Sequence, residues 1–303
     1  MNKISALALG ILILTGCLDF EKQTMTYRHF PKADTLVIWQ QYEGIFGEKE
    51  KNGLSDKELE QLHSVRTTQR TFFFGNWITE YGEAMVAEII EDLQLQLKQA
   101  DPEQDPAVLR QGIALARLLQ KSVKIKNGPF YLNAQGKLSA TQEVTLSNVR
   151  QIIQLANHLM RETISQNIAR GELAADDDKY RHLLEKSVEN RMEYISLDGQ
   201  RLRFRWPMTA AMFRKEIKGD EAVAMIAQFR KAGGTVRHAN DLMTVELGKL
   251  DGGVTNLMMT LPKKEYLANA LKPVDALYGI DRQYKPEQAR ADFFKRMTAR
   301  YKN

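Results

Sequence analysis

The segment EYISLDGQRLRFRW, residues 193–206, carries the strongest local fold signal in this 303-residue sequence. Asp198-Gly199 is typical of the two-residue turn of a β-hairpin, and β-branched, aromatic and other apolar residues flank it on both sides. The sequence therefore predicts two antiparallel strands, 193–197 and 201–206, joined by Asp198-Gly199.

Three arginines alternate along the second of these strands. Because successive strand residues point to opposite faces, Arg201, Arg203 and Arg205 share one face, with neighbouring Cα atoms ~6.8 Å apart. A turn at Asp198-Gly199 places uncharged residues opposite them, namely Ser196, Tyr194 and Met192. A row of guanidinium groups without acidic neighbours suits phosphate or carboxylate, so these arginines are candidate anion-binding residues. The alternative is a solvated strand face, or pairing with acids from elsewhere in the fold.

The other face of this strand carries Leu202, Phe204 and Trp206, which we expect in the core. The same register places Glu193 on that face, opposite Phe204. A carboxylate is a poor core residue, so this position indicates that the pairing can be shifted.

The rest of the chain alternates segments of strand and helix periodicity. Strands are expected at 24–30, 34–42, 235–237, 242–247 and 254–261, with a small antiparallel sheet at 122–146. Amphipathic helices are expected at 56–70, 82–100, 106–120, 147–171, 176–188, 208–232 and from Pro286 onward. The aromatic run 72–77 is expected to fill the core between two helices. The strands do not follow a regular βαβ order, which predicts an α+β fold of antiparallel sheets and hairpins packed with amphipathic helices.

The N-terminus has the pattern of an export signal. Met1-Asn2-Lys3 is basic, and residues 4–14 are almost wholly apolar. Eleven helical residues would span about 16 Å, roughly half of a bilayer core of ~30 Å, so this run is the apolar region of a signal peptide rather than a membrane span. The following Leu14-Thr15-Gly16-Cys17 resembles the lipobox of bacterial lipoproteins.

This resemblance implies cleavage between Gly16 and Cys17 and diacylation of the Cys17 sulfur, with palmitate or similar chains as the membrane anchor. Two or three acyl chains are enough for stable anchoring. In the enterobacterial sorting rule for such lipoproteins, Asp after the cysteine retains the protein in the inner membrane. Leu18 stands there instead and favours the outer membrane, with the periplasmic or external face left open.

The expected organisation is a signal peptide over 1–16, a tether over 17–23 and a single α+β domain over 24–303, with a boundary near 171–175 as the alternative. Cys17 is the only cysteine, so the sequence allows no internal disulfide.

Positive charge is concentrated in the last third of the chain. Residues 201–303 hold 20 Lys and Arg against 11 Asp and Glu, although the whole chain carries a net charge of only +5. Such asymmetry is typical of a face that meets an anionic partner, but scattered surface lysines give the same count.

No standard catalytic motif occurs in the sequence, and the five histidines, at positions 29, 63, 158, 182 and 238, do not pair at helical spacing. The run Asp176-Asp177-Asp178 is better explained as a helix start than as a cation site. We therefore expect no catalytic residue, metal or cofactor.

These features favour a non-enzymatic binding, scaffold or assembly module of the bacterial cell envelope, anchored by lipid to the outer membrane. Its expected partners are the membrane and an anionic envelope component or acidic protein. Nucleic acid is not expected as a partner, because the lipobox resemblance implies a mature chain outside the cytoplasm. The alternative is a lipid-anchored hydrolase whose site is assembled from distant residues. The oligomeric state stays open.

Overall fold

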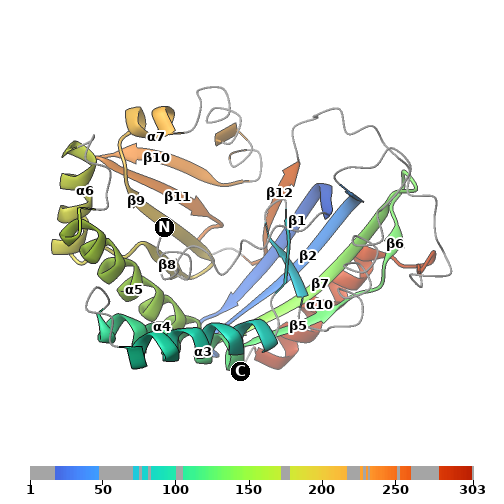
Figure 1. The fold of residues 1–303 in the computed structure, drawn as a ribbon. Helices are drawn as coiled ribbons and strands as arrows, with labels where there is room; N and C mark the ends of the chain where they lie inside the picture. The colour runs from blue at the N-terminus through green and yellow to red at the C-terminus, as the bar shows by residue number, and fades with distance from the viewer. Residues whose placement is uncertain are drawn as a thin grey trace. The chain divides into compact units, whose positions relative to one another are not determined.

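The computed structural model describes residues 18–47, 71–74, 77–80, 83–99, 105–171, 178–216, 226–227, 230, 233–250, 253–260 and 280–301. The fold is α+β, with antiparallel sheets and amphipathic helices, as the sequence predicts (Figure 1). The expected helix at 56–70 and Cys17 lie outside the described residues.

The chain divides into two compact units, each assembled from separated segments. The sheet unit takes its described residues from Leu12–Met85, Ser122–Ser147 and Asn256–Asn303, and the helix-rich unit from Val86–Lys121 and Asn148–Thr255. This division differs from the single domain expected over 24–303. It also differs from the alternative boundary at 171–175, because the helices that flank it, α5 (Val149–Ala169) and α6 (Asp178–Glu189), lie in the same unit.

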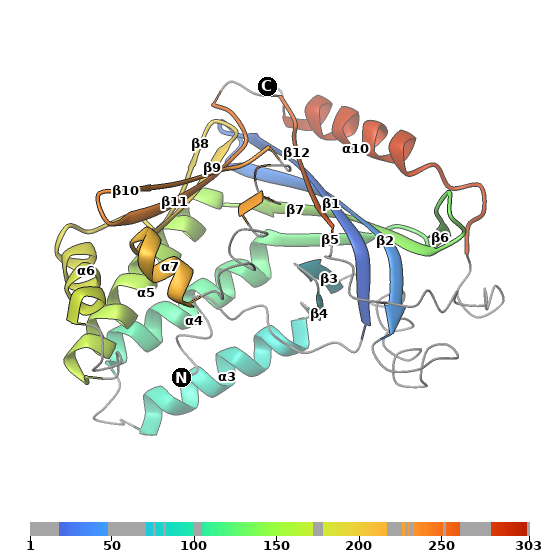
Figure 2. The same ribbon diagram turned by 90° about the horizontal axis from the view of Figure 1, so that it is seen from above.

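The sheet unit is built on a six-stranded sheet with the order β12-β1-β2-β7-β5, in which β6 also pairs with β7. The strands are β1 (Leu18–Phe30), β2 (Thr35–Gly47), β5 (Val123–Asn127), β6 (Tyr131–Leu132), β7 (Leu138–Ser147) and β12 (Thr255–Thr260). The small sheet expected at 122–146 is therefore part of a larger one. Strand β12 lies beside β1, so the sheet joins segments from both halves of the sequence (Figure 2).

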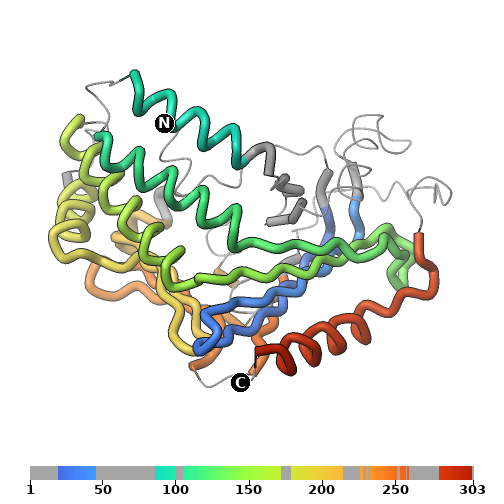
Figure 3. The backbone as a smooth tube through the Cα atoms, turned by 90° about the horizontal axis from the view of Figure 1, so that it is seen from below, coloured from blue at the N-terminus to red at the C-terminus, as the bar shows by residue number. Residues whose placement is uncertain are grey.

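Strands β1 and β2 form a long antiparallel hairpin, which confirms the two strands expected at 24–30 and 34–42 (Figure 3). The turn is closed by Asp34, whose N–H donates to the Pro31 carbonyl and whose φ is +47°. The hairpin is longer than expected, because pairing continues to Leu18 opposite Gly47. The expected tether over 17–23 is therefore wrong from residue 18 onward. Its alternation of polar and apolar residues is strand periodicity rather than linker composition.

Helix α10 (Pro286–Tyr301) packs against this sheet. The predicted apolar stripe of the helix is confirmed: Phe293 is buried against Val37 and Trp39, and the ring centroids of Trp39 and Phe293 are 5.8 Å apart. Ala289, Met297 and Tyr301 pack around the same cluster. Strands β3 (Thr71–Phe74) and β4 (Trp77–Glu80) pair with each other, so the aromatic run expected as a core filler contributes two short strands.

The helices of the second unit largely match their sequence patterns. Helices α3 (Glu83–Gln99) and α4 (Pro106–Ser122) confirm the expected spans, and α5 and α6 confirm the next two. Asn148 stands at the start of α5 with φ +57° and forms no side-chain capping hydrogen bond. Helix α6 begins at Asp178, as the acidic run indicates.

A four-stranded antiparallel sheet with the order β10-β11-β9-β8 completes the helix-rich unit. Its strands are β8 (Ile195–Asp198), β9 (Arg201–Pro207), β10 (Thr235–Ala239) and β11 (Leu242–Leu247), and a short helix α7 (Ala210–Glu216) follows β9. Tyr194 and Trp206 pack with α5 and α6 through Met160, Ile164 and Leu184. These helices therefore cover one face of the sheet.

The β8–β9 hairpin is present, but its turn lies one residue later than predicted. Asp198 pairs with Arg201, so the two loop residues are Gly199 and Gln200. The reason is tertiary: a Cβ at Gly199 would lie 2.2 Å from the Leu250 carbonyl oxygen, and Gln200 N–H donates to that oxygen at 3.3 Å. Gly199, with φ +57°, is therefore the first central turn residue, where a type II′ turn favours glycine.

Candidate functional site

The predicted arginine row lies on one face of the four-stranded sheet. Arg201, Arg203 and Arg205 alternate along β9, and the side chains of the intervening residues point to the face that packs on the helices. Trp206 is part of that packing, as expected, whereas Phe204 is 39% exposed and does not fill the core. Glu193 is exposed rather than buried, because the shifted register pairs Ile195 with Phe204.

Two of the three arginines have acidic neighbours, contrary to the prediction. Arg203 Nε donates to Glu246 Oε1 of β11 at 2.7 Å, and both side chains are less than one-fifth exposed. Arg201 Nη2 lies 3.2 Å from Asp198 Oδ2 in an exposed pair across the turn. The predicted absence of neutralisation was wrong because the turn is displaced and because β11 contributes an acid from a distant part of the sequence.

Glu246 lies among three arginines. Burial disfavours its charge, but the hydrogen bond from Arg203 and the charges of Arg203, Arg201 and Arg237 outweigh burial and lower the pKa of the carboxyl. Glu246 is therefore ionised at neutral pH and compensates a large part of the positive charge at this end of the face.

Arg205 has a different environment. The register places Thr244 of β11 opposite Arg205, and Arg237 of β10 on the other side of Thr244. These three residues form a row across three strands, which we call the Arg-Thr-Arg row. Within the described parts of the chain, no acidic side chain forms an ion pair with Arg205 or Arg237. Among the described residues, Arg205 and Arg237 are thus without an ion-pair partner, although the charge of Arg237 acts on Glu246.

Sequence reasoning missed Arg237. Exposed and half-buried residues alternate along β10, and this alternation is the signal that could have identified Arg237. The exposed residues are Thr235, Arg237 and Ala239, and the half-buried ones are Val236 and His238. The alternation places Arg237 on the outer face of a strand. Only the strand order β10-β11-β9 brings that face next to Arg205.

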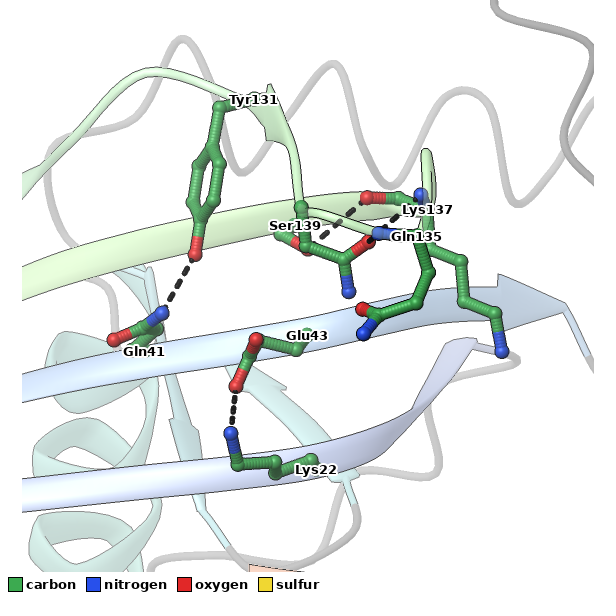
Figure 4. Close-up of polar contacts among 8 residues, drawn as sticks. Lys22, Gln41, Glu43, Tyr131, Gln135, Lys137 and Ser139 are labelled. Carbon is green, nitrogen blue, oxygen red and sulfur yellow. Dashed lines mark hydrogen bonds and ion pairs between the residues drawn. The ribbon is translucent and has the colours of Figure 1, made fainter. Parts of the chain in front are cut away.

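A second polar cluster lies at one end of the sheet unit (Figure 4). Gln41 Nε2 donates to the Tyr131 hydroxyl at 2.9 Å, Lys22 pairs with Glu43, and burial raises the pKa of the Tyr131 hydroxyl. Asn133 Oδ1 accepts the backbone N–H groups of Gln135 and Lys137 at 3.0 and 2.9 Å. The two bonds to Asn133 hold the turn between β6 and β7. The polar groups of this cluster are therefore bonded to one another, which indicates a structural role.

The histidines of the described chain do not form a recognisable site. His158 and His182 lie near glutamates one helical turn away, at 3.7 Å from Glu162 and 3.9 Å from Glu185. His238 packs near the Phe213 ring. His63 lies outside the described residues.

Neither a metal site nor a membrane span is found in the described residues. No group of three or more His, Cys, Asp and Glu side chains among them could hold a metal ion. In the same residues, no helix is both long and apolar enough to cross a bilayer.

Comparisons with models of protein families, with curated proteins and with solved structures found no match for this chain.

Proposed function

We propose that this protein is a lipid-anchored component of the bacterial cell envelope that acts as a non-enzymatic binding or assembly module. The observation that carries the proposal is the sequence Leu14-Thr15-Gly16-Cys17 behind a short apolar run. Cys17 carries the acyl chains in this proposal, and Leu18 directs the protein to the outer membrane.

The position of β1 gives the anchor a structural consequence. The strand begins at Leu18, directly after Cys17, and is paired with β2 from its first residue. The acyl chains are thus attached to the first strand of the sheet without an intervening linker. Under this proposal, the end of the sheet that contains Leu18 lies at the membrane surface.

The binding element of the module is the arginine face of the four-stranded sheet. Four arginines, at positions 201, 203, 205 and 237, share this face with two acids, Asp198 and Glu246. The net positive charge supports an anionic envelope component as the ligand. The alternative of a hydrolase has no specific observation in its favour among the described residues.

Metabolic labelling with an alkyne analogue of palmitate tests the proposal. The wild-type protein should be labelled and should fractionate with outer membranes, and Cys17→Ala should abolish the label. Thr15→Ala is the matched control, because it keeps a small residue in the lipobox and should retain the label. An unlabelled wild-type protein, or a labelled Cys17→Ala variant, would contradict lipid anchoring.

A further inference from the structure

We propose that the Arg-Thr-Arg row formed by Arg205, Thr244 and Arg237 is a binding site for a phosphate group. This inference rests on the proposed function, in which the arginine face is the binding surface, and it specifies the ligand and the residues that hold it.

The sheet register builds the site. Arg205 pairs with Thr244, and Thr244 pairs with Arg237, so the three residues lie in line on one face of β9, β11 and β10. Neighbouring strands are ~4.8 Å apart, so the two arginine Cα atoms lie roughly 10 Å from each other with the threonine between them. The register therefore places two arginines on either side of a threonine on one face of the sheet.

Direct ion pairing distinguishes this row from the other two arginines of the face. Arg203 is bonded to Glu246, and Arg201 is paired with Asp198. The carboxyl of Glu246 is directly opposite Arg203, whereas the residue directly opposite Arg205 is the uncharged Thr244. A bound anion would place negative charge between the two guanidinium groups, which charge-assisted hydrogen bonds favour.

The donor set favours phosphate over carboxylate. A single arginine fork already satisfies both oxygens of a carboxylate. A phosphate group has more oxygens and up to two negative charges, so it can accept hydrogen bonds from two guanidinium groups and a hydroxyl together. Arg237 is exposed on the outer strand, so a ligand can reach the row from solvent.

The test titrates inorganic phosphate into the purified, lipidated protein in an uncharged detergent at low salt, followed by calorimetry. We expect saturable binding that is weakened at least tenfold by Arg205→Gln and by Arg237→Gln. Arg110→Gln removes the same charge from an exposed arginine of α4, outside the arginine face, and should weaken binding less than threefold. Acetate should bind at least tenfold more weakly than phosphate.

Several results would overturn the site. These are the absence of saturable phosphate binding, an equal loss in Arg110→Gln, and equal affinity for acetate. Thermal unfolding of each variant shows whether it is folded, and Thr244→Val provides a second variant that removes only the hydroxyl donor and should weaken phosphate binding measurably.

Two further arms identify the source of the phosphate group. Glycerol 3-phosphate represents a soluble ligand. A vesicle-capture assay tests a lipid headgroup. The protein is reconstituted in phosphatidylcholine vesicles, which are then mixed with vesicles that contain phosphatidylglycerol. Capture of the phosphatidylglycerol vesicles should require Arg205 and Arg237. Phosphate binding does not depend on acylation of Cys17. A labelled protein without phosphate binding overturns this inference alone, and an unlabelled protein that binds phosphate contradicts only the anchor.

Discussion

The side-chain amide of Asn157 forms two hydrogen bonds with the backbone of Ile195. Asn157 Nδ2 donates to the Ile195 carbonyl oxygen at 2.7 Å, and Asn157 Oδ1 accepts from the Ile195 N–H at 2.9 Å. Ile195 is the first residue of β8, an edge strand of the four-stranded sheet. The side-chain amide of Asn157, a residue of α5, therefore supplies the donor and acceptor that a neighbouring strand would supply. It attaches the edge of the four-stranded sheet to the helix.

Substitution of Asn157 should release this edge. Asn157→Ala removes both bonds from a 5% exposed side chain and should lower the free energy of unfolding by about 2 kcal/mol. Gln154→Ala, at an exposed position of the same helix, should change it by less than about 0.5 kcal/mol. Urea unfolding measures both values, and amide exchange at Ile195 should accelerate only in Asn157→Ala. Equal stabilities would show that the two bonds contribute nothing.

The packing of α10 gives a second test. Phe293 is 1% exposed and lies against Trp39 and Val37. Phe293→Ala leaves a cavity between the helix and the sheet and should cost about 3–5 kcal/mol. Lys295→Ala, on the exposed side of the same helix, should be nearly neutral. Thermal unfolding of the two variants distinguishes them, and a small effect of Phe293→Ala would contradict the packing of α10 on this sheet.

The ion pair between Arg203 and Glu246 predicts a pH dependence of stability. The folded-state pKa of Glu246 lies below the ordinary value of 4.5 for a glutamate carboxyl. The carboxylate therefore stabilises the fold above that pH, and its contribution is lost as the pH falls through the folded pKa. Glu246→Gln should lower the free energy of unfolding by about 1 kcal/mol at pH 7.

The difference between wild type and Glu246→Gln should shrink when urea unfolding is repeated below pH 4. Glu193→Gln, at an exposed carboxylate outside this ion pair, is the matched control and should change the free energy of unfolding by less than about 0.5 kcal/mol at pH 7. A difference that stays constant across the pH range would show that Glu246 does not titrate as a paired carboxylate.

Local sequence patterns predicted the individual elements better than their assembly. The stripe of Phe293 and the β1–β2 hairpin depend on residues close in sequence, so helix and strand periodicity identified them. Strand β12 joins the sheet beside β1, more than 200 residues away, and no local pattern specifies that pairing. Each of the two units is assembled from segments far apart in the sequence. Local patterns do not indicate such an arrangement, so the sequence predicted a single domain.

The candidate site shows the same limit. The alternation of Arg201, Arg203 and Arg205 correctly placed them on one face. The acid that neutralises Arg203 and the second arginine beside Thr244 come from β11 and β10, whose order in the sheet is a tertiary property. The turn shift at Gly199 likewise depends on the distant Leu250 carbonyl.

The short distance between Cys17 and the sheet predicts an orientation on the membrane. Lys137, in the turn after β6, pairs with Glu21 near the start of β1. This turn therefore lies at the end of the sheet that the anchor would hold. The turn that contains Lys32 lies at the other end of β1, which has 13 residues. At ~3.3 Å per residue, the two ends are separated by roughly 40 Å.

Fluorophores at the two ends of β1 test this orientation in vesicles that contain lipid-linked quencher. Cys17 is the only cysteine and is acylated in the proposal, so Gln135→Cys and Lys32→Cys each add a single free thiol for labelling. Both positions are exposed. We expect at least twofold stronger quenching at position 135, because a direct attachment at Leu18 restricts the sheet to one orientation. A long Gly-Ser linker inserted between Cys17 and Leu18 should reduce the difference. Equal quenching without the linker, or stronger quenching at position 32, would contradict attachment of the sheet through this end.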